Sequence, residues 1–145
     1  MHRLAPEFGK LFRDWRALID HTLKPHGLSF ALWQVLDFVS RAEGPVTQVE
    51  IANGTGVEPS TLTRQLDQME AAQLIVRSSS PHDRRVKLIR LGAEAAGRMP
   101  ELSAAVQAEA ARVLDGVDPA EICGMREVVQ QLRRRLVARE LAAQA

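Results

Sequence analysis

The sequence has little of what stabilises or anchors several other classes of protein. Its 145 residues include one cysteine, Cys123, so an internal disulfide is excluded. Its apolar runs are far shorter than the roughly 20 residues that span a bilayer. The N-terminal stretch MHRLAPEFGK has no apolar core of a secretory signal. We therefore expect a cytoplasmic protein with no membrane partner.

An excess of charge of one sign is also absent. The 19 Lys and Arg residues nearly balance the 18 Asp and Glu residues, which gives a net charge of +1. A polyanionic partner would therefore have to be met by local clusters of positive charge. Hydrophobic residues make up 46% and charged residues 26% of the chain, which is ordinary for a folded domain and excludes wholesale disorder. The length predicts a single domain over residues 1–145.

The sequence lacks the common motifs of catalytic and metal sites. It contains no GxSxG, GxxxxGK[ST] or HExxH pattern and no pair of cysteines. The histidines are scattered without the spacing of metal ligands: His2, His21, His26 and His82. We expect no enzyme activity, metal or cofactor, and we expect Cys123 to be a buried, inert thiol. An enzyme with a dispersed catalytic set and a helical adaptor protein remain the alternatives.

The N-terminal part of the chain has the periodicity of amphipathic helices. Apolar residues spaced by three and four predict a first helix, with Phe8, Leu11, Phe12, Trp15, Leu18, Ile19 and Leu23 on one stripe. Pro25 and Gly27 end this helix. Ser29 can cap a second helix, whose core face carries Leu32, Leu36 and Val39.

Two short helices are predicted to follow. Thr47 and Glu50 have the spacing of a capping box, and Gly54 and Gly56 stop the helix that begins there. Pro59 suits the first position of the next helix, which runs through PSTLTRQLDQMEAAQ. Two short helices joined by a glycine-containing turn indicate a helix-turn-helix.

The second of these helices has two unlike faces. Leu62, Leu66 and Met69 fall on the core side. The other side carries Ser60, Arg64, Asp67 and Ala71, flanked by Thr61 and Thr63. Small side chains around one arginine favour close approach to a DNA groove, with Arg reaching guanine and Ser or Thr reaching phosphates. The ordinary alternative is a solvated helix start with Arg64 in a surface ion pair with Asp67 or Asp83.

A β-hairpin is predicted after this helix. LIVR (residues 74–77) and VKLIRL (86–91) read as strands, and the polar turn SSSPHD joins them. This order of elements is a winged helix-turn-helix. Arg84 and Arg85 fall near the tip of the wing, where the negative potential of a narrow minor groove would attract them. The alternative for this pair is a solvated loop.

The last third of the chain, residues 92–145, is predicted to be helical. Pro100 should kink or break the first part, and Asp118 and Glu121 form a capping-box pattern around Pro119. An apolar stripe follows, made of Ile122, Met125, Val128 or Val129, Leu132 and Leu136. The terminal helices carry more apolar surface than a small winged core covers, so a symmetric homodimer is expected. We expect the winged helix-turn-helix over about residues 29–92 and dimerisation helices over about 5–26 and 93–145.

The stretch GVEPSTLTRQLDQMEAAQLIVRSSSPHDRRVKLIRL resembles the MarR family of bacterial transcription regulators. The N-terminal LFRDWRALIDHTLKPHGLS is similar to the SlyA branch of that family, including WRALIDH and LKP. The resemblance covers roughly residues 8–140. It implies a mainly helical fold with a small β-hairpin wing, and a homodimer on a pseudo-palindromic operator in double-stranded DNA. It places the recognition role on Ser60, Thr61, Thr63 and Arg64, and the minor-groove role on Arg84, with Arg85 next.

The resemblance also implies a crevice for a small aromatic or phenolic effector. Arg13, Arg16 and Trp33 match positions that line this crevice in SlyA-like proteins. The chain departs from the pattern in two places. Gly92 stands where a threonine is usual after the wing, although glycine can also occupy an N-cap. Asp37 stands where SlyA-like proteins tend to have histidine, and a carboxylate there would repel an anionic ligand.

Overall fold

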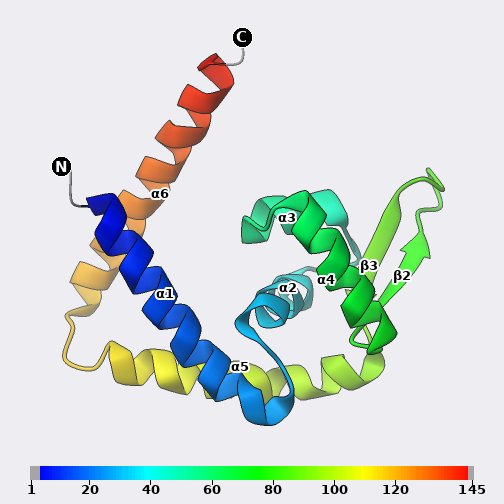
Figure 1. Ribbon diagram of the computed structural model, residues 1–145, viewed down its shortest axis with the longest axis horizontal. Coiled ribbons are helices and arrows are strands. Elements are labelled where there is room, and N and C mark those ends of the chain that lie inside the picture. Colours follow the sequence, from blue (N-terminus) through cyan, green and yellow to red (C-terminus); the bar gives the residue numbers. More distant parts are fainter. Residues whose placement is uncertain (1–3, 144–145) are drawn as a thin grey trace. The chain divides into compact units, whose positions relative to one another are not determined.

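Helices and one small sheet make up the fold. The computed structural model describes residues 4–143, apart from the side chains of residues 140 and 141. Within this range lie six α-helices and a three-stranded antiparallel sheet (Figure 1). The predicted fold class, mainly helical with a small wing, is confirmed. The chain divides into two compact units after Ala110.

The α-helices and the two strands of the hairpin follow one another in the predicted order, and a short 3-10 helix and a two-residue strand lie between them. The elements are α1 (Leu4–Leu23), the short 3-10 helix η1 (Lys24–His26), α2 (Phe30–Arg41), β1 (Val46–Thr47), α3 (Gln48–Thr55), α4 (Pro59–Ala71), β2 (Ile75–Ser79), β3 (Lys87–Leu91), α5 (Ala93–Val113) and α6 (Pro119–Ala143). None of these helices is long and apolar enough to cross a membrane.

The predicted caps of α2 and α3 are present. The Ser29 hydroxyl accepts from the backbone N–H of Leu32 at the start of α2. Thr47 and Glu50 form the capping box at the start of α3, where the Thr47 N–H donates to the Glu50 carboxylate over 2.6 Å. Gly56 ends α3 with a φ of 73°, a left-handed conformation that glycine adopts without strain. These signals keep α3 short and turn the chain into α4.

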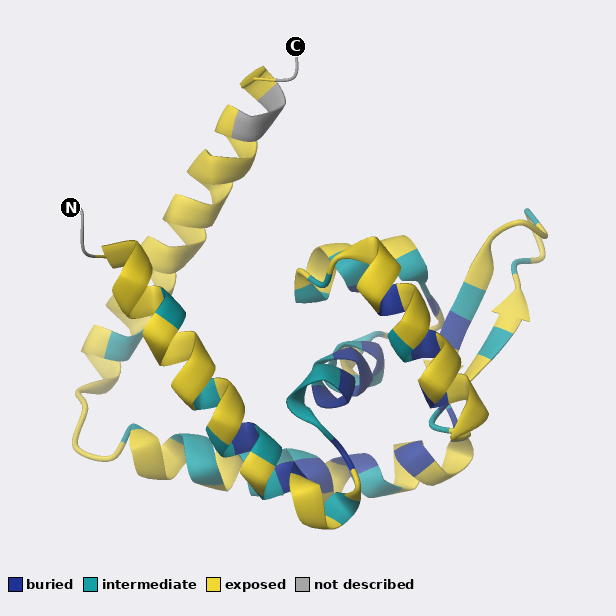
Figure 2. Cartoon of the chain, in the orientation of Figure 1, coloured by how far each residue is buried: buried dark blue, intermediate teal, exposed yellow. Residues whose placement is uncertain are grey.

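One side of α4 lies in the core. Leu62, Leu66 and Met69 are fully buried, as the helical wheel predicts. They belong to a single cluster that also contains residues of α1, α2, α3 and the sheet: Ile19, Leu36, Ile51, Ile75 and Ile89. Figure 2 shows these buried positions alternating with exposed ones along the helix. Burial of one side therefore fixes which side of α4 faces outward.

The wing is a three-stranded sheet with the strand order β1-β3-β2. β2 and β3 pair antiparallel, with Arg77 opposite Ile89, which confirms the predicted hairpin. β1 was not predicted, because two residues are too few to show an alternating pattern. Val46 of β1 pairs with Ile89 and joins the start of α3 to the wing.

The sequence predicts that Pro100 kinks or breaks this part of the chain, but α5 runs unbroken from Ala93 to Val113, so a break is wrong. Proline removes only one backbone hydrogen bond, the one that position 100 would donate to Ala96. Ala95, Met99 and Leu102 are all buried in the core around this point. Packing on both sides of Pro100 therefore holds the helix together.

Gly92 allows the wing to lead directly into α5. A Cβ at this position would lie 2.1 Å from the backbone oxygen of Gln73, which is closer than two non-bonded atoms can approach. The Gly92 N–H donates to the Leu74 oxygen over 2.8 Å, and the Gly92 oxygen accepts from the N–H of Ala96. The glycine that departs from the family pattern thus starts the helix where expected and also permits a close backbone contact.

Two helices expose apolar side chains. On α1, Phe8, Leu11 and Phe12 are 40–56% exposed. On α6, every described side chain is exposed except Ile122, which is half-buried. Cys123 is exposed as well, so the expectation of a buried thiol is wrong for the single chain. The predicted apolar surplus of the terminal helices is therefore a real feature of the monomer.

Candidate nucleic-acid interface

The outward side of α4 gathers the predicted recognition residues. Ser60, Thr61, Thr63 and Arg64 are all exposed, within the first two turns of the helix. Leu62 between them is fully buried and holds this part of α4 against the core. The four side chains therefore stand on a rigid element rather than on a loop.

Glu58 caps the start of α4. Its carboxylate accepts from the backbone N–H groups of Ser60 (2.8 Å) and Thr61 (3.3 Å), and also from the Ser60 hydroxyl. The Ser60 hydroxyl bond, followed by these backbone bonds, lowers the pKa of Glu58 below its ordinary value. A lowered pKa means that the cap stabilises the helix at neutral pH and is lost as the pH falls through that pKa. In the free protein the Ser60 hydroxyl proton is already engaged.

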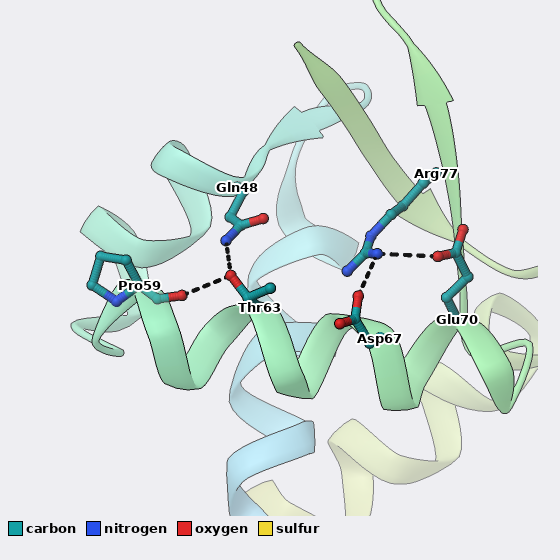
Figure 3. Close-up of polar contacts among 6 residues, drawn as sticks. All are labelled: Gln48, Pro59, Thr63, Asp67, Glu70 and Arg77. Carbon is teal, nitrogen blue, oxygen red and sulfur yellow. Dashed lines mark hydrogen bonds and ion pairs between the residues drawn. The ribbon is translucent and has the colours of Figure 1, made fainter. Parts of the chain in front are cut away.

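Thr63 is held by two neighbours. Its hydroxyl donates to the backbone oxygen of Pro59 over 3.0 Å and accepts from the side-chain amide of Gln48 over 2.7 Å (Figure 3). The hydroxyl has only one proton to donate. Thr63 therefore has no proton left to donate to a further partner, while Thr61 makes no side-chain hydrogen bond among the described residues.

Arg64 makes no ion pair or side-chain hydrogen bond with any residue that the structure describes. The two acidic partners considered from the sequence are taken by other arginines. Asp67 pairs with Arg77 of β2 over 2.6 Å, and Asp83 pairs with Arg85 over 3.1 Å. The ordinary alternative for Arg64, a surface ion pair, is therefore not what the fold forms.

The wing loop separates its two arginines. Asp83 accepts from the Arg85 side chain and from its backbone N–H at 2.9 Å, and these bonds lower the pKa of Asp83. Arg84 is exposed and has no such partner in the described part of the chain. The loop that carries it projects away from the helices around the core (Figure 1). Of the adjacent pair, Arg84 is the one whose charge remains uncompensated.

A cavity of about 550 Å³ lies between α2 and the end of α3. Its lining is aromatic and polar: Phe30, Trp33, Gln34, Asp37, Phe38, Arg41, Ala42, Gly54 and Thr55. Trp33, predicted for the ligand crevice, belongs to this lining, whereas Arg13 and Arg16 do not. Arg16 instead lies 3.7 Å from Asp20, whose other oxygen accepts from the backbone N–H of Phe30.

The negative charge that Asp37 brings to the cavity is paired. Arg41, one turn later on α2, places its guanidinium 3.0 Å from the Asp37 carboxylate. The side chain of Asp37 is 23% exposed and that of Arg41 is 73% exposed, so the arginine lies on the solvent side of the pair. The predicted repulsion of an anionic ligand is thereby reduced.

Three residues near α4 escaped the sequence reasoning. Glu58 was missed because Pro59 alone explained the helix start. Gln48 and Arg77 were missed because their partners lie 15 and 10 residues away, on other elements. The sequence does contain a weak indication of the role of Arg77. Asp67 and Glu70 are one turn apart, so two carboxylates lie on the same side of a short helix and favour a basic partner.

Comparison with known proteins identifies the family. The model of the MarR family matches residues 26–86. The transcriptional regulator PA3341 is 33% identical, with 92% of this chain and 98% of that chain covered and a TM-score of 0.83. The chain belongs to the MarR family. A MarR family transcriptional regulator from Rhodococcus sp. RHA1 is 26% identical, with 89% and 94% coverage and a TM-score of 0.77.

A third similar structure contains a ligand. CouR from Rhodococcus jostii RHA1, bound to p-coumaroyl-CoA, is 27% identical, with 86% of this chain and 87% of that chain covered and a TM-score of 0.78. The protein described here thus has the winged-helix fold of MarR family transcription regulators, which are regulators rather than enzymes. No group of three or more His, Cys, Asp or Glu residues among its described residues could hold a metal ion.

Proposed function

We propose that this MarR family protein is a sequence-specific regulator of transcription that binds double-stranded DNA as a homodimer on a pseudo-palindromic operator. One observation carries the proposal. Two exposed arginines, Arg64 on α4 and Arg84 on the wing, have no partner among the described residues, although other arginines around them are paired. An unpaired guanidinium group on a rigid helix can hydrogen-bond to base edges in the major groove. An unpaired guanidinium group on a projecting loop can enter the negative potential of the minor groove.

The proposed contacts divide by element. α4 enters the major groove, where Arg64 reaches a guanine edge and Thr61 and Ser60 lie near the backbone. Thr63 contributes its methyl group and an acceptor, because its proton is donated to Pro59. The wing places Arg84 in the adjacent minor groove, with Arg85 beside it as a secondary contact.

The homodimer is supported by the exposed apolar surfaces of the terminal helices. Met125, Val129 and Leu132 of α6 are 38–50% exposed in the single chain. A contiguous apolar surface of this kind marks an interaction site. We propose dimerisation helices over about residues 5–26 and 93–145, around a winged helix-turn-helix over about 29–92. Two-fold symmetry would present two copies of α4 to two half-sites.

We also propose a small aromatic or phenolic effector, bound next to Trp33. The support is the aromatic cavity between α2 and α3, together with the ligand seen in the related CouR structure. Arg13 and Arg16, which do not line the cavity, would contact a ligand only at its margin. The placement in the SlyA-like branch stays a proposal that is supported by WRALIDH and LKP near the N-terminus.

Arg64→Ala is expected to weaken operator binding and to relax the base preference at one position in each half-site. A good bidentate contact between arginine and guanine discriminates by about 1–3 kcal/mol. The measurement is a set of binding isotherms on operators that vary base by base. If the loss were equal on all sequences, Arg64 would be a phosphate contact and not a reader of bases.

The two alternative functions are separated from this one by competition. A regulator forms a saturable complex with its own promoter region that survives an excess of unrelated DNA. An enzyme or a helical adaptor protein would show no such sequence-selective complex. A gel shift with the adjacent intergenic DNA is therefore the first experiment to perform.

A further inference from the structure

The proposed recognition helix carries more negative than positive charge. Between Glu58 and Ala71 there are three carboxylates and one arginine, Arg64. Asp67 lies three residues after Arg64, which makes the two side chains neighbours on the helix surface. In an isolated helix of this sequence Asp67 would be the nearest acidic partner of Arg64, and pairing between them would make the arginine less available to DNA.

The fold gives Asp67 a different partner. Arg77 of β2 places one guanidinium nitrogen 2.6 Å from Asp67 and 3.1 Å from Glu70 (Figure 3). The Arg77 side chain is 20% exposed, while Asp67 and Glu70 are 60% and 44% exposed. Arg77 is thus the most enclosed member of the group, and packing fixes its position. A pair held by an enclosed arginine loses less side-chain entropy than a pair between two mobile surface groups.

We infer that Arg77 is a positioning residue for DNA recognition: it holds Asp67 and so leaves Arg64 free to read a base. The inference rests on the proposed function. Arg77 lies on a strand of the wing, and its side chain points toward α4 rather than toward DNA. It would nevertheless contribute to the base preference of the protein. Pairing of Asp67 with Arg77 also explains why an acidic side chain can lie on the outward side of a recognition helix.

The two carboxylates differ in their position relative to Arg64. Asp67 is one turn from Arg64, but Glu70 is six residues away and about 240° around the helix at 100° per residue. Without Arg77, Asp67 would therefore be free to pair with Arg64, whereas Glu70 would lie too far around the helix to do so. Replacing either carboxylate with its amide changes the net charge by the same amount. The two amide variants thus separate capture of Arg64 from the general charge of the helix.

The test compares Arg77→Gln with the double variants Arg77→Gln/Asp67→Asn and Arg77→Gln/Glu70→Gln on an operator and on base-substituted operators. Arg77→Gln should lose about two- to fivefold in operator affinity, because an exposed i,i+3 pair contributes about 0.2–0.5 kcal/mol in each of two subunits, and it should lose part of the base preference that Arg64 supplies. The Asp67→Asn double variant should regain that preference, and the Glu70→Gln double variant should not. Equal recovery in both would mean that only net charge matters, and recovery in neither would mean that Arg77 only braces the wing. Either result overturns the inference.

A second readout does not depend on DNA. The side-chain Nε–H signal of Arg64 in an NMR spectrum of the free protein should move in Arg77→Gln and return in the Asp67→Asn double variant. An unmoved signal would overturn the inference even if DNA binding is lost. If the wild-type protein binds no DNA selectively, the proposed function fails, and this signal still decides which partner Asp67 takes. Thermal melts accompany every variant, and Arg77→Met, which keeps the length of the packed side chain, replaces Arg77→Gln if that variant does not fold.

Discussion

Arg84→Ala should bind its operator about a hundredfold more weakly than the wild type and melt at nearly the same temperature. A hydrogen-bonded contact to a charged group contributes about 1.5 kcal/mol or more, and a two-fold complex loses two such contacts at once, or about 3 kcal/mol. Arg84 is exposed and has no partner among the described residues, so the folded chain loses nothing with it. Exposed substitutions of this kind usually change stability by within about 0.5 kcal/mol.

The measurement is a salt series of binding isotherms for both proteins on the same operator, together with their melts. The slope of log affinity against log salt should shrink by about two units or less, for one cation per subunit. Arg85→Ala removes the same charge from the same loop. Its loss should be smaller, because Asp83 already holds the Arg85 guanidinium. If Arg84→Ala bound the operator as tightly as the wild type, the wing would have no part in DNA binding. If the variant did not fold, the role of Arg84 would be structural.

Leu132→Glu on α6 should convert the homodimer to a monomer at micromolar concentration. A buried leucine contributes roughly 1.5–3 kcal/mol, and a two-fold interface loses this twice, which raises the dissociation constant of the dimer by about 10² to 10⁴. The added carboxylate increases the loss, because it would have to be buried without a partner. Sedimentation across a concentration series measures the effect directly.

The matched control for this variant is Gln131→Glu. It adds the same charge on another side of α6, about 100° from Leu132 and about 160° from Val129 at 100° per residue, and should leave the dimer intact. The melting temperature of the wild type should also rise with concentration, as expected when folding and association are linked. A wild-type protein that sediments as a folded monomer, with a melt independent of concentration, would contradict the proposed assembly.

Local signals made much of the fold predictable from the sequence. Thr47 with Glu50, Ser29 and Gly56 act within one turn of the chain, so the helix boundaries they set could be read directly. The buried side of α4 followed from the spacing of Leu62 and Met69, because a helix with one apolar face must bury it. The wing was predictable because polar turn residues separate two short apolar runs.

Features that depend on distant partners were not predictable in the same way. Pro100 lies inside a continuous helix because residues elsewhere in the chain pack around it, and no local rule contains that information. The partner of Asp67 could not be chosen between Arg64 and Arg77 from spacing alone. Nearest neighbours in sequence favour Arg64, and only the packing of β2 beside α4 selects Arg77. Charge pairing therefore needs the tertiary structure, even where the helix itself does not.

Selective binding to DNA is the central claim, and one titration tests it most directly. The purified protein is titrated into a labelled duplex from the intergenic region beside its own coding sequence, in the presence of excess unrelated duplex, and the protected bases are mapped by footprinting. We predict a saturable complex with two symmetric protected half-sites about one helical turn apart, 10–10.5 base pairs centre to centre. Binding that the unrelated duplex removes completely, without any protected site, would contradict the account.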